Sequence, residues 1–290
     1  MIICICGPTA VGKTKLSIEL AKKYNAEIIN FDSVQIYKKM NIVSAKVTES
    51  EKEGIPHHLF DIVDVTDNYT VFDYQRDCRN IIEKLQKNNK NIIIIGGTGL
   101  YIKAALFDYK FDLEEDKKDY STYTLDELIH KIKRINPNID IDFSNRRRVE
   151  RTLEKIENNS TFTYDGDNII YPATIIGLST NRDNLYNIIN NRVDKMINNG
   201  LIEEVKSLYD RKIYSKAIKN GIGYKELYKY FDREINLDEA IDLIKKNSRK
   251  YAKRQNTFLK NKLNVKWFNV DYACFSNTIT EVYNYIISKK

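Results

Sequence analysis

The stretch that decides the fold is Ile2-Ile3-Cys4-Ile5-Cys6-Gly7-Pro8-Thr9-Ala10-Val11-Gly12-Lys13-Thr14, at the start of a sequence of 290 residues. An apolar run typical of a buried strand leads into a Gly-x-x-x-x-Gly-Lys-Thr loop, and a helical pattern follows. In such a unit the backbone N–H groups and the helix dipole converge on one point. The stretch therefore predicts a loop that binds a di- or triphosphate. A tight turn would explain Gly7 and Gly12, but not Lys13 and Thr14 together.

Strands and helices alternate after this loop. Helical patterns cover 13–24 and 71–88, and buried strand patterns cover 27–31, 91–95 and 174–178. Such an alternation predicts a parallel α/β sheet, whose ligands bind beyond the carboxyl ends of the strands. The phosphate loop, Asp32 and Gly97-Thr98 all follow strand ends, so we expect them to meet in one crevice.

The chain changes character between residues 107 and 159. This stretch begins with a charged run, Glu114-Glu115-Asp116-Lys117-Lys118-Asp119, and continues with helical patterns near 125–135 and 146–156. A polar loop is predicted at 160–171, helices at 182–211, 223–231, 237–260 and 278–288, and a short strand at Trp267-Phe268. We therefore predict a P-loop-type α/β core with C-terminal helices, formed by 1–106 and 160–290, and a small helical insertion domain at 107–159.

The composition limits which classes of protein this chain can belong to. Lys and Arg total 47 against 40 Asp and Glu, and the net charge of +7 permits a polyanionic partner without requiring one. The cysteines, Cys4, Cys6, Cys78 and Cys274, form no CxxC pair or Cys/His cluster, so we expect neither structural zinc nor disulfides. A strand that starts at residue 2 leaves no room for a leader, and no apolar run approaches the ~20 residues of a membrane span. We expect a soluble, cytoplasmic monomer.

An acidic residue is missing from one strand end. The buried strand 91–95 runs into Gly96-Gly97-Thr98, where a hydrolysing phosphate-loop enzyme usually has an aspartate that holds Mg²⁺. The acid follows the second strand instead, at Asp32. An aspartate there can hold a metal through water, act as a base directed into the crevice, or cap the turn. Spacing alone does not decide between the capping and the catalytic role.

Nine sequence blocks carry a resemblance to a known family. In chain order they are Gly7 to Thr14, Asn30-Phe31-Asp32-Ser33-Val34-Gln35-Ile36-Tyr37, Pro56-His57-His58-Leu59 with Asp61, Gly96-Gly97-Thr98-Gly99-Leu100-Tyr101, Arg148-Val149-Glu150-Arg151-Thr152-Leu153-Glu154, Arg192-Val193-Asp194-Lys195-Met196, Gly200-Leu201, Gly223-Tyr224-Lys225-Glu226 and Ala252-Lys253-Arg254-Gln255-Asn256-Thr257. Together they resemble the bacterial tRNA dimethylallyltransferases, also called tRNA isopentenyltransferases or IPP transferases. The chain departs from the family at Val43-Ser44-Ala45-Lys46-Val47, where Gly-Thr-Ala-Lys-Pro is usual, and at Phe258, where tryptophan is usual.

The resemblance implies an activity. The family transfers a dimethylallyl group from dimethylallyl diphosphate to N6 of the adenine immediately 3′ of the anticodon, in tRNAs that read codons beginning with U. The products are N6-dimethylallyladenosine and diphosphate. The phosphate loop and Mg²⁺, with Thr14 as a candidate ligand, would stabilise the leaving group. By the same resemblance Asp32 accepts the proton of the amine, and Thr98 and Arg192 reach the diphosphate from the side opposite the loop. Taken alone, Arg192 is more typical of a surface ion pair within a helix.

The resemblance also implies tRNA contacts. The segment Asp32-Ser33-Val34-Gln35 would read the flipped adenine, with the Gln35 amide suited to the edge of the base. The other implied contacts are Arg147, Arg148, Val149, Glu150, Arg151, Gly223, Tyr224, Lys225, Lys253, Arg254 and Gln255. Two basic clusters agree with this: Arg146 to Arg148 with Arg151, and Lys245-Lys246, Arg249-Lys250 and Lys253-Arg254. Each cluster alone is more typical of a solvated helix surface. We interpret His57 and His58 as structural, because no third metal ligand is apparent.

Three other functions compete with this one. A related isopentenyltransferase could act on free AMP or ADP, and a small-molecule kinase would bind ATP at the same loop. A non-catalytic RNA-binding protein could keep the loop as a nucleotide switch. The insertion and the Arg254-Gln255 segment favour tRNA over a free nucleotide as the acceptor.

Overall fold

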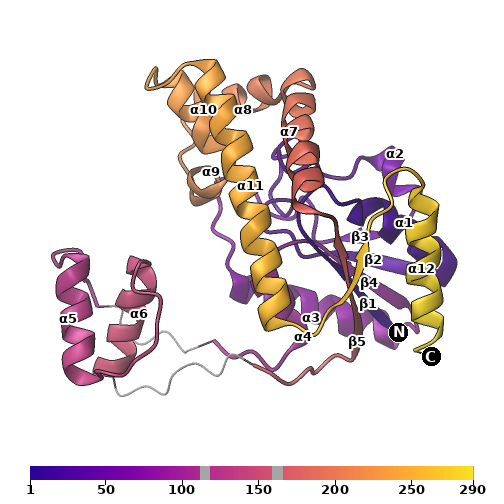
Figure 1. The fold of residues 1–290 in the computed structure, drawn as a ribbon, viewed down its shortest axis with the longest axis horizontal. Coiled ribbons are helices and arrows are strands. Elements are labelled where there is room, and N and C mark those ends of the chain that lie inside the picture. The colour runs from indigo at the N-terminus through magenta and orange to yellow at the C-terminus, as the bar shows by residue number, and fades with distance from the viewer. Residues whose placement is uncertain (112–117, 159–165, 290) are drawn as a thin grey trace. The chain divides into compact units, whose positions relative to one another are not determined.

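The computed structural model describes residues 1–111, 118–158 and 166–289. The chain divides into two compact units, Met1–Asp108 with Asn168–Lys290, and Tyr109–Asp167. Most of the charged run at 114–119 and the first half of the polar loop expected at 160–171 lie outside the described residues. Figure 1 shows the elements of each unit. No helix in the described ranges is long and apolar enough to cross a membrane.

The larger unit is built on a six-stranded parallel sheet with the order β3-β2-β4-β1-β5-β6. The strands are β1 (Ile2–Cys6), β2 (Ala26–Asn30), β3 (His57–His58), β4 (Asn91–Ile95), β5 (Ala173–Ser179) and β6 (Lys266–Asn269). Because β1 pairs with β4 on one side and with β5 on the other, the phosphate loop leaves the middle of the sheet. The predicted α/β fold with a parallel sheet is confirmed.

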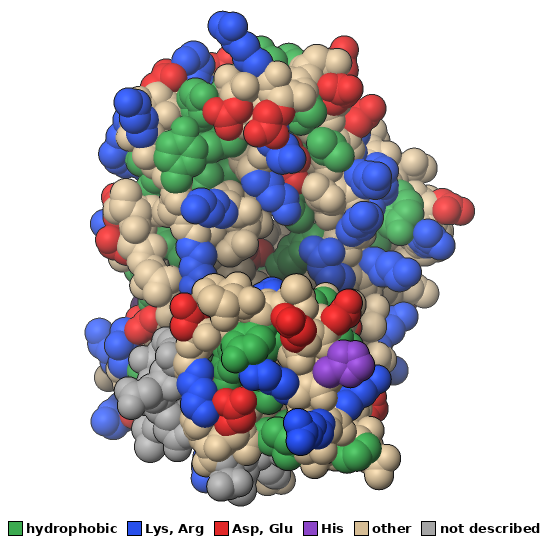
Figure 2. All heavy atoms as spheres, turned by 90° about the vertical axis from the view of Figure 1, so that its left-hand side faces the viewer, with side chains coloured by type: hydrophobic (Ala, Val, Ile, Leu, Met, Phe, Trp, Pro, Cys, Tyr) green, Lys and Arg blue, Asp and Glu red, His purple; other side chains and the backbone are tan. Residues whose placement is uncertain are grey.

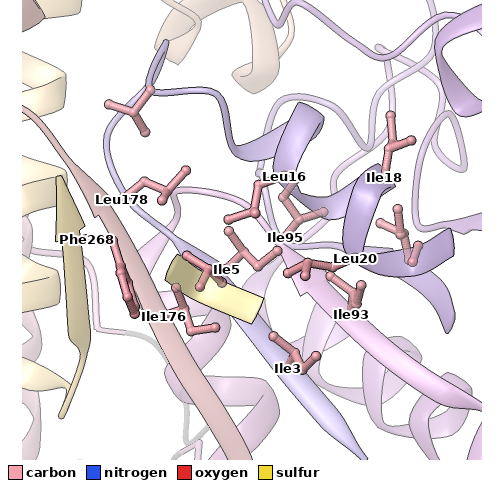
Figure 3. Close-up of a cluster of buried hydrophobic side chains, with 14 of the residues drawn as sticks. Ile3, Ile5, Leu16, Ile18, Leu20, Ile93, Ile95, Ile176, Leu178 and Phe268 are labelled. Atoms are coloured by element: carbon pink, nitrogen blue, oxygen red, sulfur yellow. The ribbon is translucent and has the colours of Figure 1, made fainter. Parts of the chain in front are cut away.

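Alternating side chains bury both faces of the sheet. Helices α1 (Lys13–Tyr24) and α12 (Phe275–Ile287) cover one face, where Ile3, Ile5 and Ile95 pack with Leu16 and Leu20 (Figure 3). Helices α3 (Val71–Lys87) and α4 (Gly99–Leu106) cover the other face. Cys4 and Cys6 lie in this second cluster as buried free thiols and pack there as small hydrophobic residues.

A cluster of helices lies beyond the carboxyl ends of the strands (Figure 1). Its members are α7 (Arg182–Asn198), α8 (Leu201–Asp210), α9 (Lys216–Asn220), α10 (Tyr224–Phe231) and α11 (Leu237–Lys262), and they pack against the segment that follows β2. The single helix predicted at 182–211 is wrong. It is two helices, because Gly200 at φ 93° caps α8 in a left-handed conformation that ends the helical path.

Four short elements were not predicted from the sequence: α2 (Glu49–Lys52), β3, α4 and α9. Helix α4 was missed because its glycine-rich start is also typical of a loop. Thr98 has the extended backbone of an N-cap residue there, at φ −85° and ψ 92°. This helix matters for the site, because its start fixes where the segment after β4 lies.

The smaller unit is a pair of helices, α5 (Leu125–Ile135) and α6 (Arg146–Glu157), around a core that includes Leu128, Val149 and Leu153. Arg146 belongs to this framework. Its guanidinium donates to the carbonyls of Tyr120 and Tyr123, each at 2.8 Å, and pairs with Glu150 at 2.7 Å. The prediction that Val149 contacts tRNA is corrected, because its side chain is fully buried in this core.

Candidate active site

The phosphate loop has the backbone geometry that its sequence requires. Gly7, Ala10 and Gly12 all have positive φ, at 143°, 71° and 87°. A Cβ at Gly7 would lie 2.6 Å from the carbonyl oxygen of Leu178 in β5, so only glycine allows this close approach. The loop thereby turns directly into α1, and its residues Thr9 to Thr14, apart from the buried Val11, line a cavity.

Lys13 supplies the charge of this loop. Its Nζ donates to the Pro8 carbonyl at 2.6 Å, and the side chain lines the same cavity. Burial lowers the pKa of Lys13 to about 8, while the nearby Asp32 acts to raise it and Arg192 to lower it. The ammonium is therefore poorly solvated, and an anion in the cavity would stabilise it.

Two cavities meet at the carboxyl edge of the sheet. The first, ≈ 520 Å³, is lined by the phosphate loop and by three cationic side chains, Lys13, Arg192 and Lys195. The second, ≈ 360 Å³, has a mixed lining. Cationic side chains there include Lys216, Lys225 and Arg254, and we call it the apolar cavity for the wall formed by Val34, Tyr37, Met40, Tyr69, Tyr101, Val193, Met196 and Tyr251. Four residues line both cavities: Thr9, Asp32, Ser44 and Arg192. A charged cavity and an apolar cavity thus share a boundary that carries one carboxylate and one guanidinium.

Asp32 is held on this boundary by Asn30. The fully buried Asn30 accepts from the Asp32 N–H at 2.8 Å and donates to the carbonyls of Asp32 and Leu59, at 3.1 and 3.0 Å. Asp32 Oδ1 accepts from the Val34 N–H at 2.9 Å. The turn cap left open by the sequence is therefore present, and the same carboxylate also borders both cavities. Asn30 was missed as a positioning residue, although an amide at the end of a buried strand was a signal for it.

Arg192 faces the site rather than the surface. Its side chain is half-buried, and Nη2 donates to the Ser44 carbonyl at 3.4 Å. Burial lowers the pKa of Arg192, and Asp32 opposes that shift. Within the described ranges it forms no ion pair with its own helix, so the alternative of a surface salt bridge does not hold. Lys195, one turn further along α7, was not singled out from the sequence, although its spacing places it on the same helix face.

Two predicted site residues are engaged elsewhere. Thr98 Oγ1 accepts from the Ser33 N–H at 3.1 Å and donates to Ser33 Oγ at 3.3 Å, and it is not among the described residues that line the two cavities. Gln35 Nε2 donates to the carbonyls of Ser44 at 2.9 Å and Ala45 at 3.4 Å. The amide donor that we expected to read a base therefore holds the 43–47 segment in this structure.

Gly223 and Tyr224 support the same segment and are corrected as tRNA contacts. The buried Tyr224 donates to Glu204 Oε1 at 2.6 Å, and Glu204 also accepts from the backbone of Asn41 and Ile42. A Cβ at Gly223 would lie 2.4 Å from Val43 Cγ2, so its φ of 94° and its lack of a side chain both serve this packing. Gln255 is buried as well and is taken up below.

The remaining predicted tRNA contacts keep accessible side chains. Arg147, Arg148, Arg151, Lys253 and Arg254 are exposed, and Glu150 and Lys225 are half-buried. Lys225 and Arg254 border the apolar cavity, and the Arg254 guanidinium lies 5.8 Å from the ring centre of Tyr251. Figure 2 shows Lys and Arg side chains spread over the face that it draws, with acidic side chains among them. These exposed positions keep their predicted role in RNA binding.

Metal ligands are few in the described ranges. No group of three or more His, Cys, Asp or Glu side chains is placed to hold an ion there. His58 pairs with Glu27 at 2.8 Å, and His57 contacts the Ile55 carbonyl at 2.8 Å and also lines the charged cavity. Thr14 and Asp32 do line the charged cavity. This sparse set of oxygen ligands fits Mg²⁺, which commonly binds one or two protein groups, substrate phosphates and water.

The sequence of this chain matches a known family and relatives of known name. A family model described as IPP transferase matches residues 35–262. The chain is 43% identical over 301 residues to the tRNA dimethylallyltransferase of Anoxybacillus flavithermus, covering 99% of this chain and 96% of that protein. Over 284 residues it is 44% identical to the tRNA dimethylallyltransferase of Bacillus subtilis, covering 93% and 90%.

Solved structures give the same result. The full-length tRNA isopentenylpyrophosphate transferase of Bacillus halodurans superposes with a TM-score of 0.77 at 41% identity, covering 99% of this chain and 96% of that chain. A eukaryotic dimethylallyltransferase acting on tRNA superposes with a TM-score of 0.81 at 27% identity, covering 100% and 80%. The resemblance found in the sequence blocks therefore extends to the whole chain and to its fold.

Proposed function

This chain belongs to the IPP transferase family, and on that premise we propose that it transfers a dimethylallyl group from dimethylallyl diphosphate to a tRNA. The acceptor atom is N6 of the adenine immediately 3′ of the anticodon, and the products are N6-dimethylallyladenosine and diphosphate. One observation carries the proposal: Asp32 and Arg192 lie where the charged cavity meets the apolar cavity. A diphosphate fits the first cavity, and a base and a prenyl group fit the second.

The chemistry needs a base and a stabilised leaving group. N6 of adenine attacks the first carbon of the prenyl group, the bond from that carbon to oxygen breaks, and its electron pair leaves with the diphosphate. The lone pair of N6 is delocalised into the ring, so a carboxylate that accepts the N6 proton as the new bond forms lowers the barrier. Asp32 borders both cavities and would accept that proton, and the loop amides, Lys13 and Arg192 would stabilise the developing negative charge in the charged cavity.

Thr14 is the residue that would hold Mg²⁺, because it contributes a hydroxyl oxygen to the charged cavity. When bound there, Mg²⁺ would neutralise part of the diphosphate charge. No water has to be activated, which agrees with a β4 that runs into Gly96-Gly97-Thr98 rather than into an acidic residue.

The alternatives fit the site less well. Asp32 could serve a kinase as a base too, but the family model and the relatives that match nearly the whole chain are IPP transferases and tRNA dimethylallyltransferases. An adenylate isopentenyltransferase needs no extended basic surface, but Lys225, Lys253 and Arg254 lie on neighbouring helices near that cavity. We therefore favour tRNA as the acceptor. A monomeric state and a cytoplasmic location stay predictions.

An acceptor competition assay tests the proposal. Labelled dimethylallyl diphosphate and Mg²⁺ are incubated with the protein and equal amounts of unmodified tRNA and AMP, with and without ATP. The label should appear in the tRNA at the same rate whether ATP is present or absent. Label in AMP would favour the adenylate enzyme, and a requirement for ATP would favour a kinase.

Reversal of charge at Arg147 or Arg254 should weaken tRNA binding. Each substitution to Glu removes a cation that can neutralise a phosphate, so the slope of log K against log salt should fall by about one per contact. Binding of tRNA is measured across a salt series, together with donor binding, which should not change. Lys87→Glu, at an exposed position in α3, is the control for the change in net charge. An unchanged slope would remove that arginine from the interface.

Donor affinity should fall at alkaline pH because of Lys13. Burial lowers the pKa of Lys13 to about 8 when no ligand is bound, and a bound diphosphate favours the charged ammonium and raises that pKa. Affinity is therefore complete below the free pKa and weakens above it, approaching a factor of about ten per pH unit. The dissociation constant of dimethylallyl diphosphate is measured against pH for the wild type and for Lys13→Arg, whose guanidinium does not titrate. A ratio of the two constants that does not vary with pH would contradict this assignment.

A further inference from the structure

Gln255 joins three segments that are far apart in the sequence. It lies in α11, and its side chain is only 5% exposed. Its Oε1 accepts from the Thr9 N–H in the phosphate loop at 3.2 Å, and its Nε2 donates to the Gly97 carbonyl after β4 at 3.1 Å. The oxygen and the nitrogen of the amide are thus both hydrogen-bonded to backbone groups, in two segments that border the charged cavity.

The surrounding packing leaves little room for another arrangement. A Cβ at Gly97 would lie 2.1 Å from Gln255 Nε2, so the glycine makes space for the amide. One helical turn earlier, Tyr251 lies close enough to Thr98 and Gln255 that both side chains act to lower its pKa. Thr98 in turn accepts from the Ser33 N–H, next to Asp32. One face of α11 therefore connects to the phosphate loop, to the segment after β4 and to the turn that carries Asp32.

We propose that Gln255 is a positioning residue for the donor: it fixes the Thr9 end of the phosphate loop against the Gly97 carbonyl, so that the loop amides converge on the diphosphate. The inference rests on the proposed function for the identity of the donor. It replaces the expected role of Gln255 as a tRNA contact, because the buried amide has no accessible donor to offer to RNA. Neighbouring Lys253 and Arg254 are exposed and keep that role.

Gln255→Glu gives the sharpest test, because its effect depends on protonation. In its neutral form the introduced carboxyl group can still donate to the Gly97 carbonyl and accept from the Thr9 N–H. In its ionised form it can only accept, and it repels both the Gly97 carbonyl and a bound diphosphate. Burial raises the pKa of such a carboxyl group above its usual value of about 4.3, so the neutral form is regained on mild acidification.

The measured quantities are the affinity for inorganic diphosphate and kcat/KM for the donor, each as the ratio of Gln255→Glu to wild type. At about pH 7.5 both ratios should fall at least tenfold, the usual scale for an unsatisfied buried hydrogen bond, and they should recover several-fold toward about pH 5.5. Taking the ratio to wild type removes the titration of Lys13, and the pKa of Tyr251 is raised to about 12, outside this range. Affinity for tRNA should not change.

Two further variants complete the design. Gln86→Glu makes the same chemical change at an exposed position in α3 and should leave every quantity unchanged. Gln255→Met is neutral and loses both hydrogen bonds, so its defect should be equal at every pH. A Gln255→Glu ratio that does not vary with pH, a normal diphosphate affinity, or a loss of tRNA affinity instead would each overturn the proposal.

A measurement on the wild-type protein tests the proposal even if the variants do not fold. The Thr9 amide proton should exchange slowly with solvent, because it is bonded to a buried acceptor in a loop that is otherwise at the surface of a cavity. Fast exchange of this amide would overturn the proposal. Diphosphate binding by the wild type is observed without any tRNA, so failure of the prenyl transfer itself is distinguished from failure of this inference.

Discussion

Asp32→Asn is expected to lower kcat for prenyl transfer by ~10²–10⁴-fold, the usual contribution of a general base. Donor affinity should stay within a factor of about three, because this substitution removes a group that acts in the transition state and not in donor binding. The measurement is the rate of transfer to tRNA at saturating donor, together with the dissociation constant of dimethylallyl diphosphate.

The asparagine variant is more informative than alanine. Asp32 Oδ1 accepts from the Val34 N–H, and an asparagine Oδ1 can do the same, so the turn keeps its cap. Only the negative charge and the ability to take a proton are lost. Asp32→Ala removes the cap as well, and its loss of rate would combine two effects.

Asp242→Asn is the matched control, because it makes the same change at an exposed position in α11. Its kcat and donor affinity should equal those of the wild type. If folded Asp32→Asn turns over at the wild-type rate, Asp32 serves only as the turn cap and the base lies elsewhere.

Lys13→Gln should impair donor binding and catalysis together. The Lys13 side chain is half-buried and lines the charged cavity, and Asp32 is the one carboxylate among the groups that shift its pKa. One charge-assisted hydrogen bond to a phosphate oxygen is worth about 1.5–3 kcal/mol, which corresponds to roughly 10- to 100-fold in affinity. Because negative charge grows on the leaving group, kcat should fall in addition to the rise in donor KM.

The test is steady-state kinetics with the donor varied at saturating tRNA, with Lys87→Gln at an exposed position as the control. Donor kcat/KM should fall by on the order of 10³ in Lys13→Gln and stay unchanged in Lys87→Gln. A donor KM within the error of the wild-type value would contradict the placement of the diphosphate at this loop. Affinity for tRNA should be the same in all three proteins.

Local patterns predicted much of this molecule. The conformations of the phosphate loop, its strand and its helix depend on neighbouring residues. The thirteen residues from Ile2 to Thr14 were therefore enough to predict this unit. The parallel sheet followed from buried strands that alternate with helices. Asp32 was identified because it follows a strand, and the structure places it beside Lys13 and Arg192 at one edge of the sheet.

Contacts between distant segments could not be predicted in the same way. Gln255 bonds to a residue 246 positions earlier, and Arg192 bonds to Ser44 across 148 positions. Nothing near Tyr224 in the sequence indicates that its hydroxyl would meet Glu204 under a loop that starts at Asn41. A polar residue in a family block can either contact the substrate or support the fold. Only its burial and its hydrogen-bond partners in the structure distinguish these two roles.

The departure from the family at 43–47 has a physical explanation in the same contacts. Gln35 donates to the backbone carbonyls of Ser44 and Ala45, and Arg192 donates to that of Ser44. Lys46, which the family shares, is held by the Tyr37 carbonyl at 2.7 Å and by Asp61. At Ser44, one of the positions that differ, the site uses the backbone carbonyl, so this difference leaves the bonds from Gln35 and Arg192 intact.

Mass analysis of the reaction product tests the central claim most directly. The protein is incubated with dimethylallyl diphosphate, Mg²⁺ and unmodified tRNA. The tRNA is then digested, and the masses of its nucleosides and fragments are measured by mass spectrometry. The account predicts one adenosine, immediately 3′ of the anticodon, heavier by one dimethylallyl group in place of a hydrogen, with diphosphate released in equal amount. Unmodified tRNA after incubation with folded protein, or a dimethylallyl group on any other nucleoside, would contradict it.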